Sequence, residues 1–329
     1  MLLWTDNHPL MRKYSYLLAI ACIFFIAVVS CSNHEIVIQK RCILKMSDYP
    51  DSSFIGDIRC LQYHDGQLFL LDINRRSVLI MNDDFSSFQS VSMGGRGPGE
   101  LLDPFSFTVS GDSIYVMDFG PNAMKTFVGG RFIGEKSFPF MIRDQRFVKS
   151  GGVFYFPYRD PKASVISTSL EGPHSVFLES ERHSNDAKTV TMNSCNVLAY
   201  RENLIIILDA LPWVKIVGKD GKVLRILDLA QSALYKRNVA FAHRADKEDK
   251  CCYVLNRDAC VVGEDLLILI PCYDEGYECN RIISVDLNSG HQTKEMMLLQ
   301  GTDYTSFCSD GSRLYVFNGS DNQIEVYER

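Results

Sequence analysis

The stretch Asp65-Gly66-Gln67-Leu68-Phe69-Leu70-Leu71-Asp72, followed by Ser77-Val78-Leu79-Ile80-Met81, decides the fold of this chain. A turn opens it, an apolar run leads to an acidic residue, and a second apolar run returns, which is the pattern of a β-hairpin. The same pattern begins again near Gly111, Gly151, Glu202, Gly263 and Asp310. About six copies, at intervals of roughly 40 to 60 residues, predict one domain with a radial repeat fold, because a single hairpin unit cannot bury both of its faces.

The composition is that of a globular protein, and it excludes one class of partner. The 329 residues are 46% hydrophobic and 22% charged, and the formal net charge is −6. Nucleic-acid backbones are bound by clustered Lys and Arg, whereas this acidic chain has no sustained basic stripe. We therefore expect no nucleic-acid partner.

Residues 1–30 have the pattern of an export signal, in which a basic start precedes an apolar run that ends at a small residue. The basic start is Met11-Arg12-Lys13, and the apolar run covers 14–29. This run of about 16 residues is shorter than the roughly 20 that a membrane-spanning helix needs. Since Met11 is the better start, we interpret 1–10 as an over-long gene prediction. An uncleaved membrane anchor is the alternative interpretation of the segment.

The end of this segment, Val28-Val29-Ser30-Cys31, resembles the lipobox of bacterial lipoproteins. The resemblance implies that Cys31 is diacylated and becomes the N-terminus, that 31–34 is a lipidated tether, and that the protein is held at a membrane. Two acyl chains are what stable anchoring requires. Ser32, in place of an aspartate, is similar to the sorting signal for the outer membrane. The leaflet that the protein faces stays open.

The two ends of the remaining chain predict how the ring closes. Residues 35–45 have strand character but no hairpin partner, and the last repeat supplies only about three strands, at 305–309, 313–318 and 323–327. Propeller blades have four strands. Pairing of the N-terminal strand with the last blade would complete that blade and remove an open sheet edge.

The predicted fold is therefore all-β: a six-bladed β-propeller of four-stranded antiparallel blades over 35–329, closed by the N-terminal strand. Four blades are expected near 58–93, 105–138, 145–177 and 193–227, and the last two begin near 258 and 305. The hairpin pattern fails at 228–256, where 233–244 has apolar residues at helical spacing. We interpret this insertion as a helix or an ordered loop.

Gly95-Arg96-Gly97-Pro98-Gly99-Glu100 lies between the first two predicted blades. It lacks the Lys-Ser/Thr pair of a phosphate-binding loop, so we interpret it as a structural turn in which Arg96 and Glu100 fix adjacent blades. With the six repeats and the lipobox, this stretch resembles the six-bladed β-propeller lipoproteins of Gram-negative gut anaerobes, which are described as TolB-like or NHL-like. The resemblance implies a fold and an exported location, and it implies no catalytic residues.

Propeller topology places the blade-to-blade connections on the same face as the connections between the second and third strands. Arginine and aromatic residues, which are enriched at recognition sites, occur in these connections. The candidate ligand-binding residues are Arg75, Arg96, Glu100, Tyr158, Arg159, Trp213 and Tyr273. Such a face suits a glycan, an acidic peptide or an envelope protein, so the leading hypothesis is a non-catalytic binding or scaffold module. Each of these residues could also be an ordinary exposed loop residue.

The alternative hypothesis is a metal-dependent propeller hydrolase or lactonase, whose cation lies in the central channel. Oxygen ligands suited to Ca²⁺ are expected near the inner strands, at Asp57, Asn193, Asn196, Asn256 and Asp258. No Ser-His-Asp arrangement is recognisable, and we assign no catalytic residue. A purely structural spacer is a third possibility, because propellers host all three roles.

Nine of the 11 cysteines follow Cys31, and none of them forms a Cys-x-x-Cys motif, which argues against zinc. Cys272 and Cys279 flank a short loop, where an oxidising compartment would permit a disulfide. Cys60 and Cys308 lie in strands, and we expect them to be buried as small apolar residues.

Overall fold

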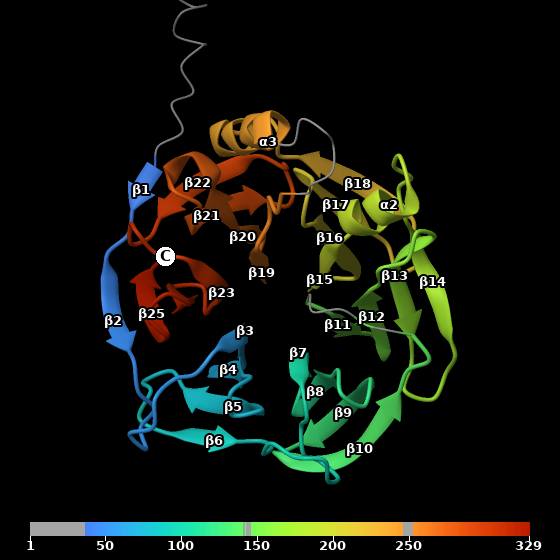
Figure 1. Cartoon of the computed structure of the whole chain (residues 1–329), viewed down its shortest axis with the longest axis vertical. Coiled ribbons are helices and arrows are strands. Elements are labelled where there is room, and N and C mark those ends of the chain that lie inside the picture. The colour runs from blue at the N-terminus through green and yellow to red at the C-terminus, as the bar shows by residue number, and fades with distance from the viewer. Residues whose placement is uncertain (1–36, 141, 143–145, 246–252) are drawn as a thin grey trace, which may run out of the picture. The chain divides into compact units, whose positions relative to one another are not determined.

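The computed structural model describes residues 37–140, 142, 146–245 and 253–329. The predicted signal peptide and the tether with Cys31 lie outside these residues. The domain from Val37 to Arg329 is a ring of six antiparallel blades, each with its first strand innermost (Figure 1). This confirms the predicted six-bladed β-propeller. No helix in the described ranges is long and apolar enough to span a membrane.

Each blade is built from four consecutive strands, except the last, which has only three consecutive strands. Blades one to three contain β3 (Ile58–His64), β4 (Gln67–Asp72), β5 (Ser77–Asn82), β6 (Phe88–Ser90), β7 (Pro104–Ser110), β8 (Ser113–Asp118), β9 (Ala123–Val128), β10 (Arg131–Ser137), β11 (Val148–Ser150), β12 (Val153–Pro157), β13 (Ala163–Thr168) and β14 (His174–Glu179). Blades four to six contain β15 (Cys195–Tyr200), β16 (Asn203–Leu208), β17 (Trp213–Val217), β18 (Val223–Asp228), β19 (Asp258–Val262), β20 (Asp265–Cys272), β21 (Glu278–Asp286), β22 (Gln292–Met297), β23 (Tyr304–Ser309), β24 (Arg313–Asn318) and β25 (Gln323–Glu328).

The repeated hairpin pattern follows from the position of the second strand in each blade. Asp65 and Gly66 join β3 to β4 with positive φ angles of 46° and 79°, the left-handed conformation that a tight hairpin turn requires. Leu68 and Leu70 then pack toward blade six, whereas Phe69 and Leu71 pack toward blade two. Because both faces of β4 are covered, its sequence is a continuous apolar run instead of an alternating one.

The hydrophobic core is divided among the blade interfaces. The described residues form six clusters of buried side chains, and each cluster lies between two neighbouring blades around the ring. Each blade therefore depends on both of its neighbours for burial, and ring closure completes the core.

The N-terminal strand closes the ring, as predicted, but it is two strands and not one. β2 (Cys42–Met46) pairs antiparallel with β25 and supplies the missing fourth strand of blade six. β1 (Val37–Gln39) pairs in parallel with β22 and adds a fifth strand to blade five. The prediction of one continuous strand is wrong because the backbone N–H of Lys40 still donates to Met297, after which the chain crosses to the next blade.

Two helices lie in the connections on either side of blade four. α3 (Ala233–Ala245) lies in the 228–256 insertion and buries Leu234 and Tyr235 in the cluster between blades four and five. The short helix α2 (Asp186–Met192) follows β14, and its N-cap Asn185 accepts a hydrogen bond from the backbone of Lys188. A single 3-10 turn, η1 (Tyr273–Glu275), joins β20 to β21.

The cysteines in the described residues are free thiols, and most of them are buried. Cys60 and Cys308 are among the buried ones, as predicted. The permitted disulfide between Cys272 and Cys279 is not formed. Cys272 packs between blades four and five and Cys279 between blades five and six, so they contribute to cores on opposite faces of one blade.

Candidate functional site

The six inner strands begin around the centre of the ring and surround a cavity of about 460 Å³, which we call the mouth cavity. It opens on the face that carries the blade-to-blade connections, and every blade or its preceding connection contributes to the wall. Representative lining residues, one from each in chain order, are Arg59, Phe105, Arg146, Asn196, Asp258 and Thr305.

Three of these side chains are placed by irregularities in the inner strands. The strand register shifts at Arg59 in β3, at Phe105 in β7 and at Thr305 in β23. Such bulges redirect side chains and are common beside binding sites. All three residues line the mouth cavity, so the same local device recurs at equivalent positions in blades one, two and six.

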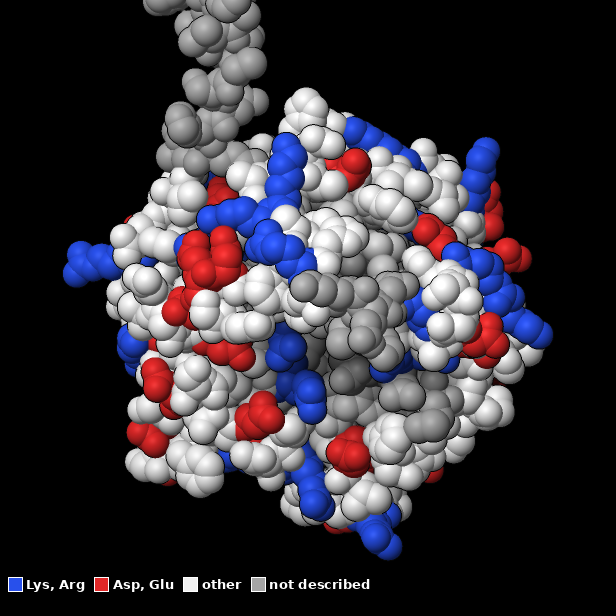
Figure 2. Space-filling view, turned by 45° about the horizontal axis from the view of Figure 1, so that its top comes forward, with Lys and Arg blue, Asp and Glu red and all other residues white. Residues whose placement is uncertain are grey.

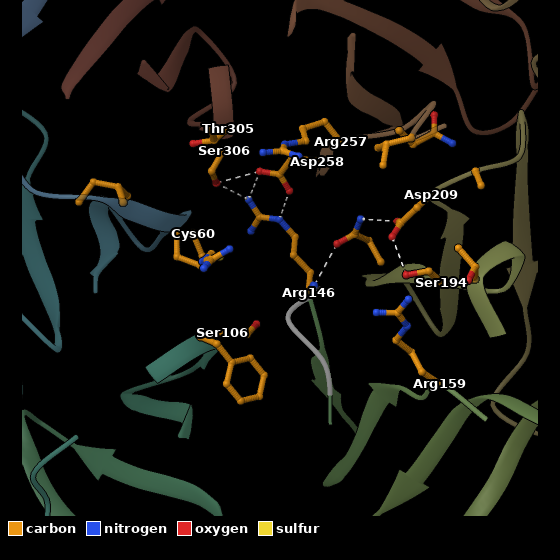
Figure 3. Close-up of a pocket in the computed structure, with 18 of the residues that line it drawn as sticks. Cys60, Ser106, Arg146, Arg159, Ser194, Asp209, Arg257, Asp258, Thr305 and Ser306 are labelled. Atoms are coloured by element: carbon orange, nitrogen blue, oxygen red, sulfur yellow. Dashed lines mark hydrogen bonds and ion pairs between the residues drawn. The ribbon is translucent and has the colours of Figure 1, made fainter. Parts of the chain in front are cut away.

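A buried ion pair crosses the mouth from blade three to blade five. The guanidinium of Arg146 donates two hydrogen bonds to the carboxylate of Asp258, with Nη2 at 2.7 Å from Oδ2 (Figure 3). It donates a third to the carbonyl of Phe307 at 2.9 Å. Burial disfavours the charge of Arg146, but Asp258 outweighs it and raises the pKa of the guanidinium. Arg146 is therefore a permanent cation that ties three blades together.

On the other side of the mouth, polar residues of blade four form a network. Asp209 accepts hydrogen bonds from Ser194 at 2.8 Å and from the amide of Asn196 at 3.3 Å (Figure 3). The carbonyl oxygen of the Asn196 side chain accepts the backbone N–H of Arg146 at 2.9 Å. This wall is thus fixed by hydrogen bonds before any ligand arrives.

Three further arginines line the same cavity. Arg59 and Arg257 are exposed, Arg159 is half-buried, and none of them makes an ion pair with another residue that the structure describes. The Nε atom of Arg159 is buried without a hydrogen-bond partner in the described residues. Figure 2 shows basic side chains in and around the central hollow. A buried donor without a partner is unfavourable, and an anion at this place would satisfy it.

The predicted calcium ligands do reach the mouth, but their oxygens do not form a cation site. Asp57, Asn196, Asn256 and Asp258 all line the cavity. Asp258 is neutralised by Arg146, and it also accepts the backbone N–H of Phe307 at 2.9 Å. The side-chain oxygens of Asn196 and Asn256 already accept hydrogen bonds from protein donors. No cluster of three or more His, Cys, Asp or Glu that could hold a metal is found among the described residues.

The fifth predicted ligand, Asn193, lies away from the cavity wall. It caps the C-terminal end of α2, and its amide donates to the carbonyls of Glu181 and Thr189, both at 2.8 Å. Of the five predicted ligands, only Asp57 keeps a carboxylate without a hydrogen bond or ion pair in the described residues. One available carboxylate is a poor match for Ca²⁺, which takes six to eight oxygen ligands.

Of the predicted ligand-binding residues, Arg159 lines the mouth cavity and the other six do not. Arg75 lies on the predicted connection, but its guanidinium packs over the ring of Tyr49 at 4.5 Å and contacts Asp51 at 3.6 Å. It fastens the segment before blade one.

Arg96 and Glu100 lie in the glycine-rich connection, as expected, but their side chains make different contacts. The carboxylate of Glu100 turns back and accepts the backbone N–H of Gly97 at 2.7 Å. Gly99, with φ of +77°, packs against Phe132 of blade two so closely that a side chain would not fit. Arg96 is exposed and lines a separate groove on blade two together with Lys125.

The three predicted aromatic residues pack into structural clusters. Tyr158 contacts Phe140, with ring centroids 5.6 Å apart, and Trp213 packs between blades three and four. Tyr273 stacks on Phe241 at 5.2 Å and donates a hydrogen bond to the carbonyl of Val254, which holds the insertion against blade five. Burial raises the pKa of Tyr273 to about 12.

Sequence reasoning missed Arg59, Arg146 and Arg257 as site residues. A signal was present, since all three stand within two residues of the start of an inner strand. What the sequence does not show is the bulge at Arg59, nor the channel-crossing side chain of Arg146 that would exclude a cation.

The comparisons with known proteins agree with the observed fold. A family model described as a 6-bladed beta-propeller matches residues 48–209, which contain blades one to three and half of blade four. The chain is similar to a candidate exported protein from Bacteroides fragilis, with 14% identity, coverage of 89% of this chain and 99% of that chain, and a TM-score of 0.56.

A protein of unknown function from Bacteroides thetaiotaomicron is also similar, with 11% identity, coverage of 89% and 73%, and a TM-score of 0.56. So is virginiamycin B lyase from Staphylococcus aureus, with 12% identity, coverage of 87% of both chains and a TM-score of 0.50. No curated protein matches the sequence. At these identities the likeness to solved structures shows the propeller fold alone.

Proposed function

We propose that this protein is an exported, lipid-anchored binding module that captures a carboxylate-bearing ligand in the mouth of its ring. The observation that carries the proposal is the convergence of Arg59, Arg159 and Arg257 on one cavity without ion-pair partners among the described residues. Arginine forms strong, charge-assisted hydrogen bonds to carboxylates. An acidic sugar or an acidic peptide would supply such groups.

The charge distribution supports an anionic ligand. The chain as a whole has a formal net charge of −6, so the general field repels anions. A hollow lined by arginines reverses that field locally and focuses it, because its walls exclude water. Asp258 does not offset these arginines, since Arg146 already neutralises it. Asp57 and Asp209 also line the cavity and reduce its positive charge, so the three arginines exceed these two carboxylates by one charge.

The location is proposed from the sequence. The signal pattern of 1–30 and the stretch Val28-Val29-Ser30-Cys31 support export and a lipid anchor, and Ser32 supports the outer membrane. At the envelope the ligand would be a glycan, a peptide or an exposed segment of a partner protein. The metal-dependent hydrolase is less well supported, because the side-chain oxygens of Asn196, Asn256 and Asp258 already bind protein donors.

Calorimetric titration at low ionic strength tests the binding role. Glucuronate and a glutamate dipeptide serve as anionic probes, and glucose serves as the neutral comparator. Arg159→Gln should weaken both anions by about tenfold or more, because hydrogen bonds to charged groups contribute about 1.5–3 kcal/mol. The matched control is Arg131→Gln, which removes an exposed arginine at the start of the outer strand β10. Added salt should lower the affinity for the two anions and leave the affinity for glucose unchanged.

Two results would contradict the proposal. One is the absence of saturable binding for either anion. The other is equal affinity in the Arg159→Gln and Arg131→Gln variants, which would place the anion outside the mouth cavity.

A further inference from the structure

A second cavity, of about 650 Å³, adjoins the mouth cavity. We call it the helix cavity, because it lies among α2, α3 and the connection that follows β16. Ala210 and Tyr253 belong to the walls of both cavities. α2 also contributes to both, with Thr191 in the mouth cavity and Met192 in the helix cavity. The two spaces are therefore neighbours at Ala210 and Tyr253, of which Ala210 is the smaller side chain.

The chemistry of the helix cavity differs from that of the mouth. Much of its wall is apolar, and it includes Leu211, Pro212, Val239, Ala242 and Leu255. Both cavities are within the size range of small-molecule sites, roughly 300–1,000 Å³. An arginine-lined space next to an apolar one matches a molecule with one anionic end and one apolar end.

We propose that the two cavities form one composite site for an amphipathic carboxylate. The carboxylate lies among the arginines of the mouth, and its apolar chain passes Ala210 into the helix cavity. This inference rests on the proposed anion-binding function and names the ligand class more narrowly.

The wall of the helix cavity also carries a histidine, His183. Its Nε2 atom is buried without a hydrogen-bond partner in the described part of the chain. Its backbone N–H donates to Thr189 of α2 at 3.0 Å, which holds the residue beside that helix. His183 is therefore one of several polar groups on this wall, together with Ser184, Lys188, Lys236 and His243.

The test is a series of straight-chain carboxylates, from butyrate to decanoate below micelle-forming concentrations, titrated into the full protein. Affinity should rise by about fourfold for each methylene that enters the helix cavity, since burial of one methylene contributes about 0.8 kcal/mol. Ala242→Trp fills the cavity and should remove this rise, while butyrate binds as in the unmodified protein. Ala233→Trp is the control, because it adds the same side chain to α3 outside the cavity wall.

The outcomes separate this inference from the proposed function. If affinity does not depend on chain length but is still lost in Arg159→Gln, the mouth binds anions and the composite site is wrong. If the rise persists in Ala242→Trp, the chain lies elsewhere and the inference is also wrong. If no carboxylate binds at all, the proposed function itself fails.

Discussion

Glu325 shows how one buried carboxylate can hold the ring closed. It lies in β25 and is fully buried, yet it accepts hydrogen bonds from Tyr304 at 2.5 Å and Asn318 at 3.1 Å, and it pairs with Lys45 of β2 at 3.0 Å. Burial disfavours its charge, but these donors outweigh burial and lower the pKa of Glu325 below its ordinary value of 4.5. The ionised form is therefore the one that stabilises the folded ring.

The sign of the resulting pH dependence is defined. Because the pKa of Glu325 is lower in the folded state, its contribution is fully present above about pH 4.5 and is lost as the pH falls through the folded value. Glu325→Gln should lower the free energy of unfolding by about 3 kcal/mol at pH 7, since it leaves Lys45 without its charge partner and disrupts a buried network. Urea unfolding at pH 7 and pH 3.5 should show a smaller difference at the lower pH.

Glu328→Gln is the matched control, because Glu328 lies on the same strand and is exposed. If Glu325→Gln lowers the free energy of unfolding by the same amount at both pH values, the charge of Glu325 does not stabilise the ring.

At the scale of elements, β1 and β2 have different importance although they are adjacent in sequence. β2 completes blade six, whereas β1 adds a fifth strand to a blade that already has four. Side chains of β2 contact the cores, with Cys42 against the cluster of blades five and six and Met46 against the cluster of blades six and one. All three residues of β1 are exposed.

Two truncations test this difference. A protein that begins at Arg41 lacks β1. Its free energy of unfolding should lie within about 1 kcal/mol of that of a protein that begins at Val37, because it loses only an exposed strand. A protein that begins at Ser47 also lacks β2 and should lose at least about 3 kcal/mol, because Glu325 is left buried without Lys45 and β25 becomes an open edge. Equal stability of the two truncated proteins, measured by urea unfolding, would refute closure by β2.

Much of this architecture could be predicted from the sequence, and the exceptions have physical reasons. The apolar run 68–71 reveals its strand because both faces are buried, and the incomplete last repeat reveals the closure. β1 was not separated from β2, because a parallel edge strand has no hairpin turn to mark it. α2 was missed because a helix of seven residues is too short to show a recognisable helical spacing of apolar residues.

The site was less predictable than the fold. The connection that carries Arg75 was placed on the expected face, but the aromatic ring of Tyr49, distant in sequence from it, draws the guanidinium away from the centre. Arg159 differs because its side chain has no such partner and lines the mouth. Sequence patterns locate a loop on a face; the direction of each side chain depends on packing that they do not encode.

For the whole molecule, the proposed anchor makes a prediction about its location in the cell. Cys31→Ala should release the protein from the membrane fraction and abolish acyl labelling, because the thiol is the attachment point that the lipobox resemblance implies. Fractionation and metabolic labelling measure both effects. Cys42→Ala, which removes a thiol of β2, is the control and should leave both unchanged. Membrane association that survives Cys31→Ala would favour the uncleaved anchor.

The pairing of β2 with β25 also has a consequence for the order of events during synthesis. β2 ends at Met46 and its partner β25 begins at Gln323. Almost the entire ring is therefore synthesised between these two paired strands. The early blades can pack on one another as they emerge, but blade six cannot form until β25 has been made. The last step of folding therefore joins the two parts of the ring that are most distant in sequence, and it must follow the synthesis of β25.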